Sequence, residues 1–416
     1  MNESEDGWAE FWERLRQERT ILSSPTRGTS HLTVVVRLYN SEPYLETVRD
    51  WLNSQTLKTP SLLVCDNAST DATWSLIQDL PSSAGWEDWT IVRNPRNLGG
   101  FGSLLLNLDL VQTDWLTDLH QDDFYYPNHV SVHFEGLKNV AGDVGFFHSQ
   151  MGSFLQEPMR FGAPPRANWF LNEPQSDLFF AANLRAHVIP NPVTSWRKLV
   201  LESTKFSWHN TAFSDTELAL KTAHWRYISS PIHTANYREN PASESHHIGK
   251  DFKRLATAIG IIESIGNPSS EKILQMPGFS GPHCQSLISE SLKSIEMRLG
   301  DNEVSRLVKT YLLEKLLQIN GPNPYINIQL AEIYSGLGGS VTSQVLTNQI
   351  PATLTARRHG TVSKRQPGPT VKFSFRLRAL IFLTRLIPKP RRIGTMMRLS
   401  RRPSISRLLP FLRSKG

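Results

Sequence analysis

The 416-residue sequence has little cysteine, no long apolar run and no acidic residue near its end. Cys65 and Cys284 are its two cysteines, too few for a disulfide framework, which suits a reducing compartment. No stretch approaches the roughly 20 apolar residues of a membrane-spanning helix. The first residues, "MNESEDGWAEFWERLRQ", carry acids and lack the apolar segment of a secretory signal. We therefore expect a cytoplasmic protein without a membrane span.

Acidic side chains are absent from Ala356 onward, where 17 Lys and Arg residues occur. The 355 residues before it hold 28 basic and 38 acidic side chains, a net charge of −10. Residues 351–416 are therefore interpreted as a separate basic amphipathic tail. Such a tail suits an anionic membrane surface, nucleic acid, or a partly disordered solubilising role. We favour the membrane surface and expect no nucleic acid, because "ALIFLTRLIP" is strongly apolar and no aromatic stacking platform accompanies the arginines.

Between residues 31 and 123, apolar runs typical of buried strands alternate with apolar runs of helical periodicity. Strands are predicted for "HLTVVVRLYN", "SLLVCDN", "WTIVRN" and "DWLTDLHQDD", and helices for "PYLETVRDWLNSQ", "STDATWSLIQDL" and "GSLLLNLDLVQ". This order is typical of an α/β fold in which helices flank a mostly parallel sheet. We expect four parts: an N-terminal helix and linker (1–30), this α/β domain (31–248), a helical region (249–350) and the basic tail (351–416).

Carboxylates follow two of the predicted strands. Asp66 ends the second, and the adjacent Asp122 and Asp123 follow the fourth. In such sheets ligands bind beyond the carboxyl ends of the strands. The adjacent pair fits a metal site, an acid/base pair or a polar turn, and Asp66 fits either a ligand contact or an Asx turn.

Residues 32–245 resemble the family 2 glycosyltransferases, which have the GT-A fold. The resemblance depends on motifs in a specific order: "VVVRLYNSEPYLETVRDWLNSQT", "LLVCDNASTDAT", "RNPRNLGGFGSLLLN" and "TDLHQDDFYYPNHV", with a weaker match in "FSDTELALKTAHWRYISSPIHTANYREN". It implies inverting sugar transfer from a nucleotide donor, with Mn²⁺ or Mg²⁺ as cofactor.

The resemblance also implies roles for individual residues. Asp123 would bind the metal, Asp122 the metal or the ribose, and Asp215 would be the catalytic base. The remaining binding residues that the motifs imply are Asp66 and Asn67 for the base, Asn97, Gly99, Gly100 and Arg238 toward the diphosphate, and His247 as an additional metal ligand. The alternatives are a flexible turn at "NLGGFG", a helix-capping acid at Asp215, a surface pair at Tyr237 and Arg238, and a solvated pair at His246 and His247.

The chain departs from the family pattern at three places. His120 stands where many members have a further carboxylate, Arg37 where proline is frequent, and leucines fill the helix that often carries an arginine. These departures leave open the metal preference and the source of the diphosphate contacts.

The predicted function is transfer of a UDP- or dTDP-linked sugar to a glycan or lipid-linked acceptor, in cell-surface polysaccharide assembly at the inner face of the cell membrane. A sugar nucleotidyltransferase is one alternative, but its Gly-rich basic loop is missing after the first strand, where "RLYNSEPYLET" stands. A degenerate binding or scaffold protein is the other, and metal-dependent donor binding distinguishes it from an enzyme.

Overall fold

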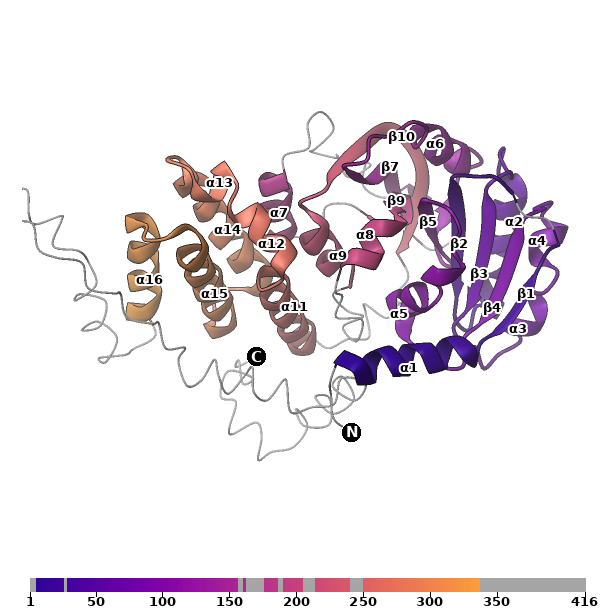
Figure 1. Ribbon diagram of the computed structural model, residues 1–416, viewed down its shortest axis with the longest axis horizontal. Coiled ribbons are helices and arrows are strands. Elements are labelled where there is room, and N and C mark those ends of the chain that lie inside the picture. Colours follow the sequence, from indigo (N-terminus) through magenta and orange to yellow (C-terminus); the bar gives the residue numbers. More distant parts are fainter. Residues whose placement is uncertain are drawn as a thin grey trace, which may run out of the picture. The chain divides into compact units, whose positions relative to one another are not determined.

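The computed structural model describes residues 5–25, 28–155, 160–161, 176–185, 190–204, 214–239 and 250–336. The chain divides into two compact units, Met1–Gly249 and Lys250–Gly416, which are shown in Figure 1 and considered separately. The predicted basic tail and the predicted metal ligand His247 lie outside the described residues.

A mixed sheet of ten strands forms the centre of the first unit. The order is β1-β4-β3-β2-β5-β9-β7-β10-β6, with β8 paired to β7. Its strands are β1 (Thr20–Ser23), β2 (Leu32–Leu38), β3 (Ser61–Asp66), β4 (Trp89–Arg93), β5 (Trp115–His120), β6 (Phe124–Tyr125), β7 (Val144–Leu155), β8 (Arg160–Phe161), β9 (Thr194–Arg197) and β10 (Arg226–Glu239). Strands β4, β3, β2 and β5 run parallel. The carboxyl ends of β3 and β5 therefore lie at one edge of the sheet, on either side of β2.

Helices accompany the strands in the predicted alternation. They are α1 (Glu5–Gln17), α2 (Leu45–Ser54), α3 (Thr73–Leu76), α4 (Leu80–Ser83), α5 (Gly99–Leu106), α6 (His129–Gly136), α7 (Ser176–Arg185), α8 (Lys198–Ser203) and α9 (Ser214–Thr222). The predicted fold class, α/β with helices around the sheet and a helical region after it, is confirmed.

Alternation along β2 assigns its side chains to two faces. Val34 and Val36 are fully buried in one cluster with Val48 and Trp51 of α2. Because successive side chains of a strand point to opposite faces, Arg37 projects to the other face, where it contacts α5. The charged side chain in this β-branched run is thus directed toward the Gly-rich stretch.

Two local predictions differ from the structure. The helix predicted over "STDATWSLIQDL" is reduced to α3 and α4, four residues each. Pro81 stands at the start of α4, where it is tolerated because its missing N–H is not needed in the first turn. The expected N-terminal linker contains β1, which pairs antiparallel with β4.

The second unit is helical, as predicted. It comprises α11 (Lys250–Ile265), α12 (Pro268–Leu274), α13 (Pro277–Ser280), α14 (Cys284–Leu299), α15 (Glu303–Asn320) and α16 (Pro324–Gly336). Asn302 begins α15 with a reciprocal capping box with Ser305, which satisfies two otherwise unpaired N–H groups. Among the residues that the structure describes, none of the helices combines the length and apolar character that a membrane-spanning segment requires.

Three buried histidines connect α6 to the sheet. His133 hydrogen-bonds Ser195 on β9 at 2.7 Å and Ser149 on β7 at 3.0 Å, and its ring lies 4.4 Å from that of His129. Burial lowers the pKa of His129 to about 3 and that of His148 to about 4, and it lowers the pKa of His133 well below its usual value. All three are therefore neutral in the folded protein at neutral pH.

Acid is expected to destabilise the first unit through these histidines. Their folded pKa values lie below the unfolded value near 6.5, so their stabilisation is complete above about pH 6.5 and is lost as pH falls. Each histidine adds about 1.4 kcal/mol per pH unit to this loss. Urea unfolding followed by tryptophan fluorescence at pH 7, 6 and 5 measures it, because every tryptophan precedes residue 226 and reports on the first unit alone.

His133→Gln provides the comparison, since glutamine retains a hydrogen bond to serine but cannot be protonated in this range. We expect its slope to be shallower by about one proton between pH 6 and 5. His120 and Asp123 have the opposite effect on the pH dependence of stability, because their folded pKa values are raised. Wild type and His133→Gln both contain these two residues, so their effect cancels in the comparison. Equal slopes for wild type and His133→Gln would contradict the prediction.

Candidate active site

Asp66 and Asn67 end β3 and are both buried. One carboxylate oxygen of Asp66 accepts the N–H of Ser69, three residues further on, at 3.0 Å. The other oxygen lies 3.3 Å from Nε of Arg93. Ala68 has a φ of 62°, a left-handed conformation that is costly for a residue with a side chain. The loop after β3 is thus held in a strained backbone conformation, a feature that is enriched at functional sites.

Asp123 is fully buried beside half-buried Asp122. Its Oδ1 accepts the backbone N–H of Arg238 at 3.1 Å, whereas its Oδ2 has no hydrogen-bond partner among the residues that the structure describes. Burial, and after it the charge of Asp122, raise the pKa of Asp123 to about 7. Full burial argues against the solvated-turn interpretation for Asp123.

A buried ionic cluster lies next to this carboxylate. The guanidinium of Arg37 donates to Oδ1 of Asp118 at 2.6 Å and to its Oδ2 at 2.5 Å, and it lies 2.8 Å from Nε2 of His120. The other ring nitrogen of His120 is 3.7 Å from Oδ2 of Asp123. Burial lowers the pKa of His120, but Asp118 and Asp123 outweigh burial and raise it. The two departures from the family pattern, Arg37 and His120, are therefore in direct contact and place positive charge beside Asp123.

The Gly-rich stretch forms the start of α5. Gly99 has a φ of 72°, which a glycine adopts without steric cost. A Cβ added to Gly100 would lie 2.4 Å from Nη1 of Arg37, so glycine is needed there for the close approach. The amide of Asn67 donates to Asn97 Oδ1 at 2.8 Å and to the carbonyl of Gly99 at 3.2 Å. The loop is thus held by named contacts and is not an unconstrained turn.

Asp215 lies in the first turn of α9 and is half-buried. Burial lowers the pKa of Arg37, but Asp118 and, to a smaller extent, Asp215 outweigh it and raise that pKa. Asp215 therefore acts electrostatically on the same guanidinium that contacts Asp118, His120 and Gly100. Glu217, two residues further on, is buried in an ion pair with Lys221, so it is committed within its own helix.

Arg238 lies near the end of β10. Its backbone N–H bonds Asp123, and its guanidinium lies 6.0 Å from the ring centre of Tyr44. The structure thus brings four predicted site residues into one group, which also contains the ionic cluster of Arg37, Asp118 and His120. These four are Asp122, Asp123, Arg238 and Asp215. Arg37 lies beside Gly100 and so connects this group to the Gly-rich turn and to the predicted residues Asp66, Asn67, Asn97 and Gly99.

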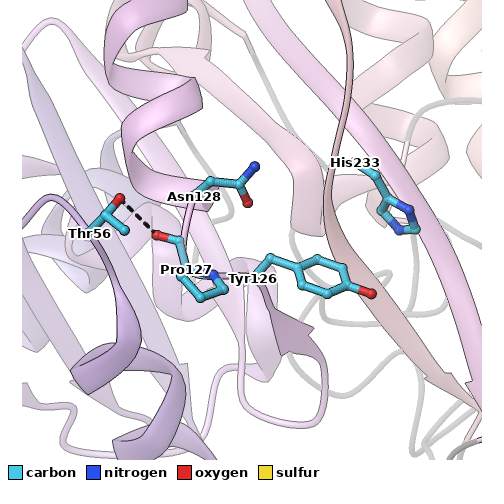
Figure 2. A pocket seen from close by; sticks show the side chains of 5 residues that line it. All are labelled: Thr56, Tyr126, Pro127, Asn128 and His233. Carbon is cyan, nitrogen blue, oxygen red and sulfur yellow. Dashed lines mark hydrogen bonds between the residues drawn. The ribbon is translucent and has the colours of Figure 1, made fainter.

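A cavity of about 390 Å³ lies beside the start of α6. Figure 2 shows it lined by Thr56, Tyr126, Pro127, Asn128 and His233. The ring of Tyr126 extends toward His233, and its hydroxyl accepts a hydrogen bond from Asn236 at 2.9 Å. None of the predicted site residues that the structure describes lines this cavity.

A divalent cation fits the carboxylates that are present. Mg²⁺ is commonly held by one or two carboxylates together with substrate phosphates. Asp122 and Asp123 supply two carboxylates, and the buried Oδ2 of Asp123 has a free lone pair. Within the part of the chain that the structure describes, no cluster of three or more His, Cys, Asp or Glu side chains could hold a metal.

The sequence predictions missed the role of Asp118. A signal was available, because Asp118 and Arg37 are opposite charges inside two runs that otherwise read as buried strands. The register pairs Val35 with Asp118 and Arg37 with His120, which places all four residues on one face. Two unlike charges on the same face of neighbouring strands, offset by two residues in the register, predict a buried ion pair.

Comparisons with known proteins bear on these observations. The family model described as glycosyl transferase family 2 matches residues 33–186. A curated relative, the Escherichia coli UDP-Glc:alpha-D-GlcNAc-diphosphoundecaprenol beta-1,3-glucosyltransferase WfaP, is 22% identical over 144 residues. The match covers 33% of this chain and 53% of WfaP, so the chain aligns with about half the length of that relative.

Two solved structures are similar at low identity. The crystal structure of S. aureus TarS is 14% identical with a TM-score of 0.46, over 71% of this chain and 50% of TarS. The mannosyltransferase PcManGT from Pyrobaculum calidifontis, in complex with GDP-Man and Mn²⁺, is 15% identical with a TM-score of 0.43, over 78% of this chain and 91% of PcManGT.

Proposed function

Because residues 33–186 belong to glycosyl transferase family 2, we propose that this protein transfers a sugar from a nucleotide diphosphate donor to a hydroxyl acceptor with inversion. The observation that carries the proposal is the environment of Asp123. A fully buried carboxylate with an unpartnered oxygen, next to a second carboxylate, is costly unless a cation completes it. In the resembling family, a cation bound there also binds the diphosphate.

The sugar donor is proposed to be UDP- or dTDP-linked. Asp66 and Asn67 would face the base, and Gly99 and Gly100 the diphosphate, where the backbone N–H groups of the first turn of α5 favour negative charge. Asp122 and Asp123 would hold Mn²⁺ or Mg²⁺, which supplies positive charge to the leaving diphosphate when bound. The cation of Arg37 supports the same charge balance from the protein side.

Asp215 is proposed to take the proton of the acceptor hydroxyl. The hydroxyl oxygen then forms a bond to the anomeric carbon, the bond between that carbon and the diphosphate breaks, and the nucleoside diphosphate leaves. This role is supported by the electrostatic influence of Asp215 on Arg37, whose guanidinium lies beside Gly100 of the Gly-rich turn.

The acceptor is proposed to be a glycan or a lipid-linked glycan in cell-surface polysaccharide assembly. The name of WfaP specifies a diphosphoundecaprenol-linked acceptor, and the basic tail of this chain, with 17 Lys and Arg and no acid from Ala356, has the charge expected for an anionic membrane surface. We therefore propose action at the inner face of the cell membrane, with no nucleic-acid partner.

Calorimetric titration with UDP and with dTDP, each with and without Mn²⁺ or Mg²⁺, tests the sugar-donor site. We expect binding on the order of micromolar for one of the two nucleotides and substantially weaker binding after metal removal. GDP is the matched control, because it carries the same diphosphate on a different base.

The scaffold alternative predicts a different result. Folded protein that binds none of the diphosphate nucleotides, with or without metal, would refute the enzyme proposal. Equal affinity for UDP, dTDP and GDP would refute base recognition by Asp66 but retain a diphosphate site.

A further inference from the structure

The N-terminal segment precedes the family match at residue 33 and packs on the Gly-rich helix. Leu15 of α1 is buried in one cluster with Leu98 and Leu106, and Phe11 packs against that cluster. The guanidinium of Arg96, in the loop before α5, lies 4.8 Å from the ring centre of Phe11. Figure 1 shows α1 lying alongside α5. This segment therefore covers both ends of the turn and helix proposed to contact the diphosphate.

Arg19, which follows α1, anchors the segment to the far end of α5. Its side chain is 4% exposed and makes two bonds to Asp109, at 2.9 and 2.7 Å. It also donates to the carbonyl oxygen of Leu106 at 3.1 Å and to Oδ1 of Asn107 at 3.0 Å. A cation at this place complements the carbonyl end of the helix.

A chain of buried amides leads from Arg19 to the Gly-rich turn. Nδ2 of Asn107 donates to Oδ1 of Asn94 at 2.9 Å, and Nδ2 of Asn94 donates to Oδ1 of Asn67 at 3.1 Å. Nδ2 of Asn67 then donates to Oδ1 of Asn97 and to the carbonyl of Gly99. Asn107, Asn94 and Asn67, here called the amide chain, are each 1–3% exposed.

Arg19 and backbone groups agree on the direction of the amide chain. A guanidinium can only donate, so Asn107 turns its oxygen to Arg19 and its NH₂ group to Asn94 and to the carbonyl of Ser103, at 2.9 Å. At the other end, the N–H of Leu98 donates to Oδ1 of Asn67 at 3.1 Å, which leaves the NH₂ group of Asn67 facing the turn. Removing Arg19 takes away the donor that Oδ1 of Asn107 faces in this buried chain, and such a loss is costly for a buried polar group. The cation thus completes the chain through which Asn67 holds the carbonyl of Gly99.

We propose that Arg19 is a positioning residue for the sugar-donor site. Through the amide chain, Arg19 fixes the turn at Asn97–Gly99 and with it the first N–H groups of α5. The proposal rests on the function proposed above, since it takes this turn as the diphosphate contact. It assigns a role in sugar-donor binding to a side chain that precedes the family match and lies at the far end of α5 from the Gly-rich turn.

Hydrogen exchange and nucleotide binding together test the proposal, with Arg19→Met compared with Arg14→Met. Arg14 belongs to the same segment, but its side chain is 60% exposed and its ion pair, with Glu18, is at 4.0 Å. In ligand-free Arg19→Met we expect exchange in peptides covering 94–107 to be about tenfold faster, with peptides from β2 and β5 unchanged. We expect UDP affinity, measured with Mn²⁺, to fall about tenfold. Arg14→Met should leave both values at the wild-type level.

Arg19→Lys covers the case in which the methionine variant does not fold. Lysine keeps the charge beside Asp109 but has no planar fork to reach Asp109, Leu106 and Asn107 together, so about a threefold change in the same direction is expected. Unchanged exchange over 94–107, or faster exchange with unchanged UDP affinity, would overturn the proposal. If wild type itself binds no UDP, the proposed function fails, and the exchange data still decide whether Arg19 holds the turn.

Discussion

Asp123→Asn should abolish sugar transfer while leaving the metal-free protein at least as stable as wild type. Asparagine has nearly the shape of aspartate, but its NH₂ group cannot replace a carboxylate oxygen toward a divalent cation. Loss of a group that stabilises the leaving diphosphate is expected to lower kcat by about 10³-fold. In the absence of metal, however, no residue in the described part of the chain hydrogen-bonds the buried Oδ2, so replacing the charge removes a desolvation cost.

Two measurements on the same samples check this result. Turnover of the nucleotide sugar and Mn²⁺-dependent UDP binding report on function, and urea unfolding after chelation, followed by tryptophan fluorescence, reports on the stability of the first unit. Asp79→Asn is a suitable control, since that carboxylate is exposed on the surface, at 70% of its side-chain area. If Asp123→Asn retains metal-dependent UDP binding, or is strongly destabilised without metal, Asp123 is a structural carboxylate and not a metal ligand.

The opposite effects that Asp123→Asn should have on activity and on metal-free stability follow from a general property of functional sites. A group that must interact with a ligand cannot also be fully satisfied by the protein. Asp118, on β5 just before Asp123, shows the contrast. Burial raises its pKa, but Arg37 and His120 outweigh burial and lower it, and both of its oxygens bond the guanidinium of Arg37. Two carboxylates of similar burial thus differ: the protein neutralises Asp118, whereas one oxygen of Asp123 is hydrogen-bonded by no residue that the structure describes.

Periodicity and strand chemistry were sufficient to predict the α/β core. The runs at β2, β3, β4 and β5 are apolar enough that burial is the only stable choice, and their turns leave carboxylates at the carboxyl edge. The sequence placed Asp66, Asp122 and Asp123 at strand ends because strand ends are local features. It also predicted the helical second unit, where capping residues such as Asn302 are local.

Contacts between distant parts of the chain could not be predicted in the same way. Thr20–Ser23 looked like linker because four exposed residues carry no burial pattern, and only pairing with β4 makes them a strand. The link from Arg19 to Asn107 spans 88 residues, and asparagines are common in loops for purely local reasons. Arg37 was noticed as a departure from the family pattern, but its partner Asp118 could be found only from the register of β2 and β5.

Asp215→Asn is the second substitution with a large expected effect, and it separates a catalytic base from a helix-capping acid. If Asp215 takes the acceptor proton, kcat should fall by about 10²–10⁴-fold, while UDP affinity with Mn²⁺ stays within about twofold, since Asp215 is not proposed to contact the nucleotide. A capping acid would instead contribute about 0.3–1 kcal/mol to stability through the helix dipole and little to turnover.

Glu303→Gln is the matched control, because Glu303 is an exposed acid in the first turn of α15 and experiences the same kind of helix dipole. Both variants are compared by steady-state kinetics at saturating sugar donor and by thermal unfolding. A fall in kcat for Asp215→Asn alone, with a similar small loss of stability in both, identifies the base. Turnover of Asp215→Asn within about threefold of wild type would be far smaller than the effect of removing a general base. In that case Asp215 serves the charge balance around Arg37, and the proton of the acceptor is taken by another group.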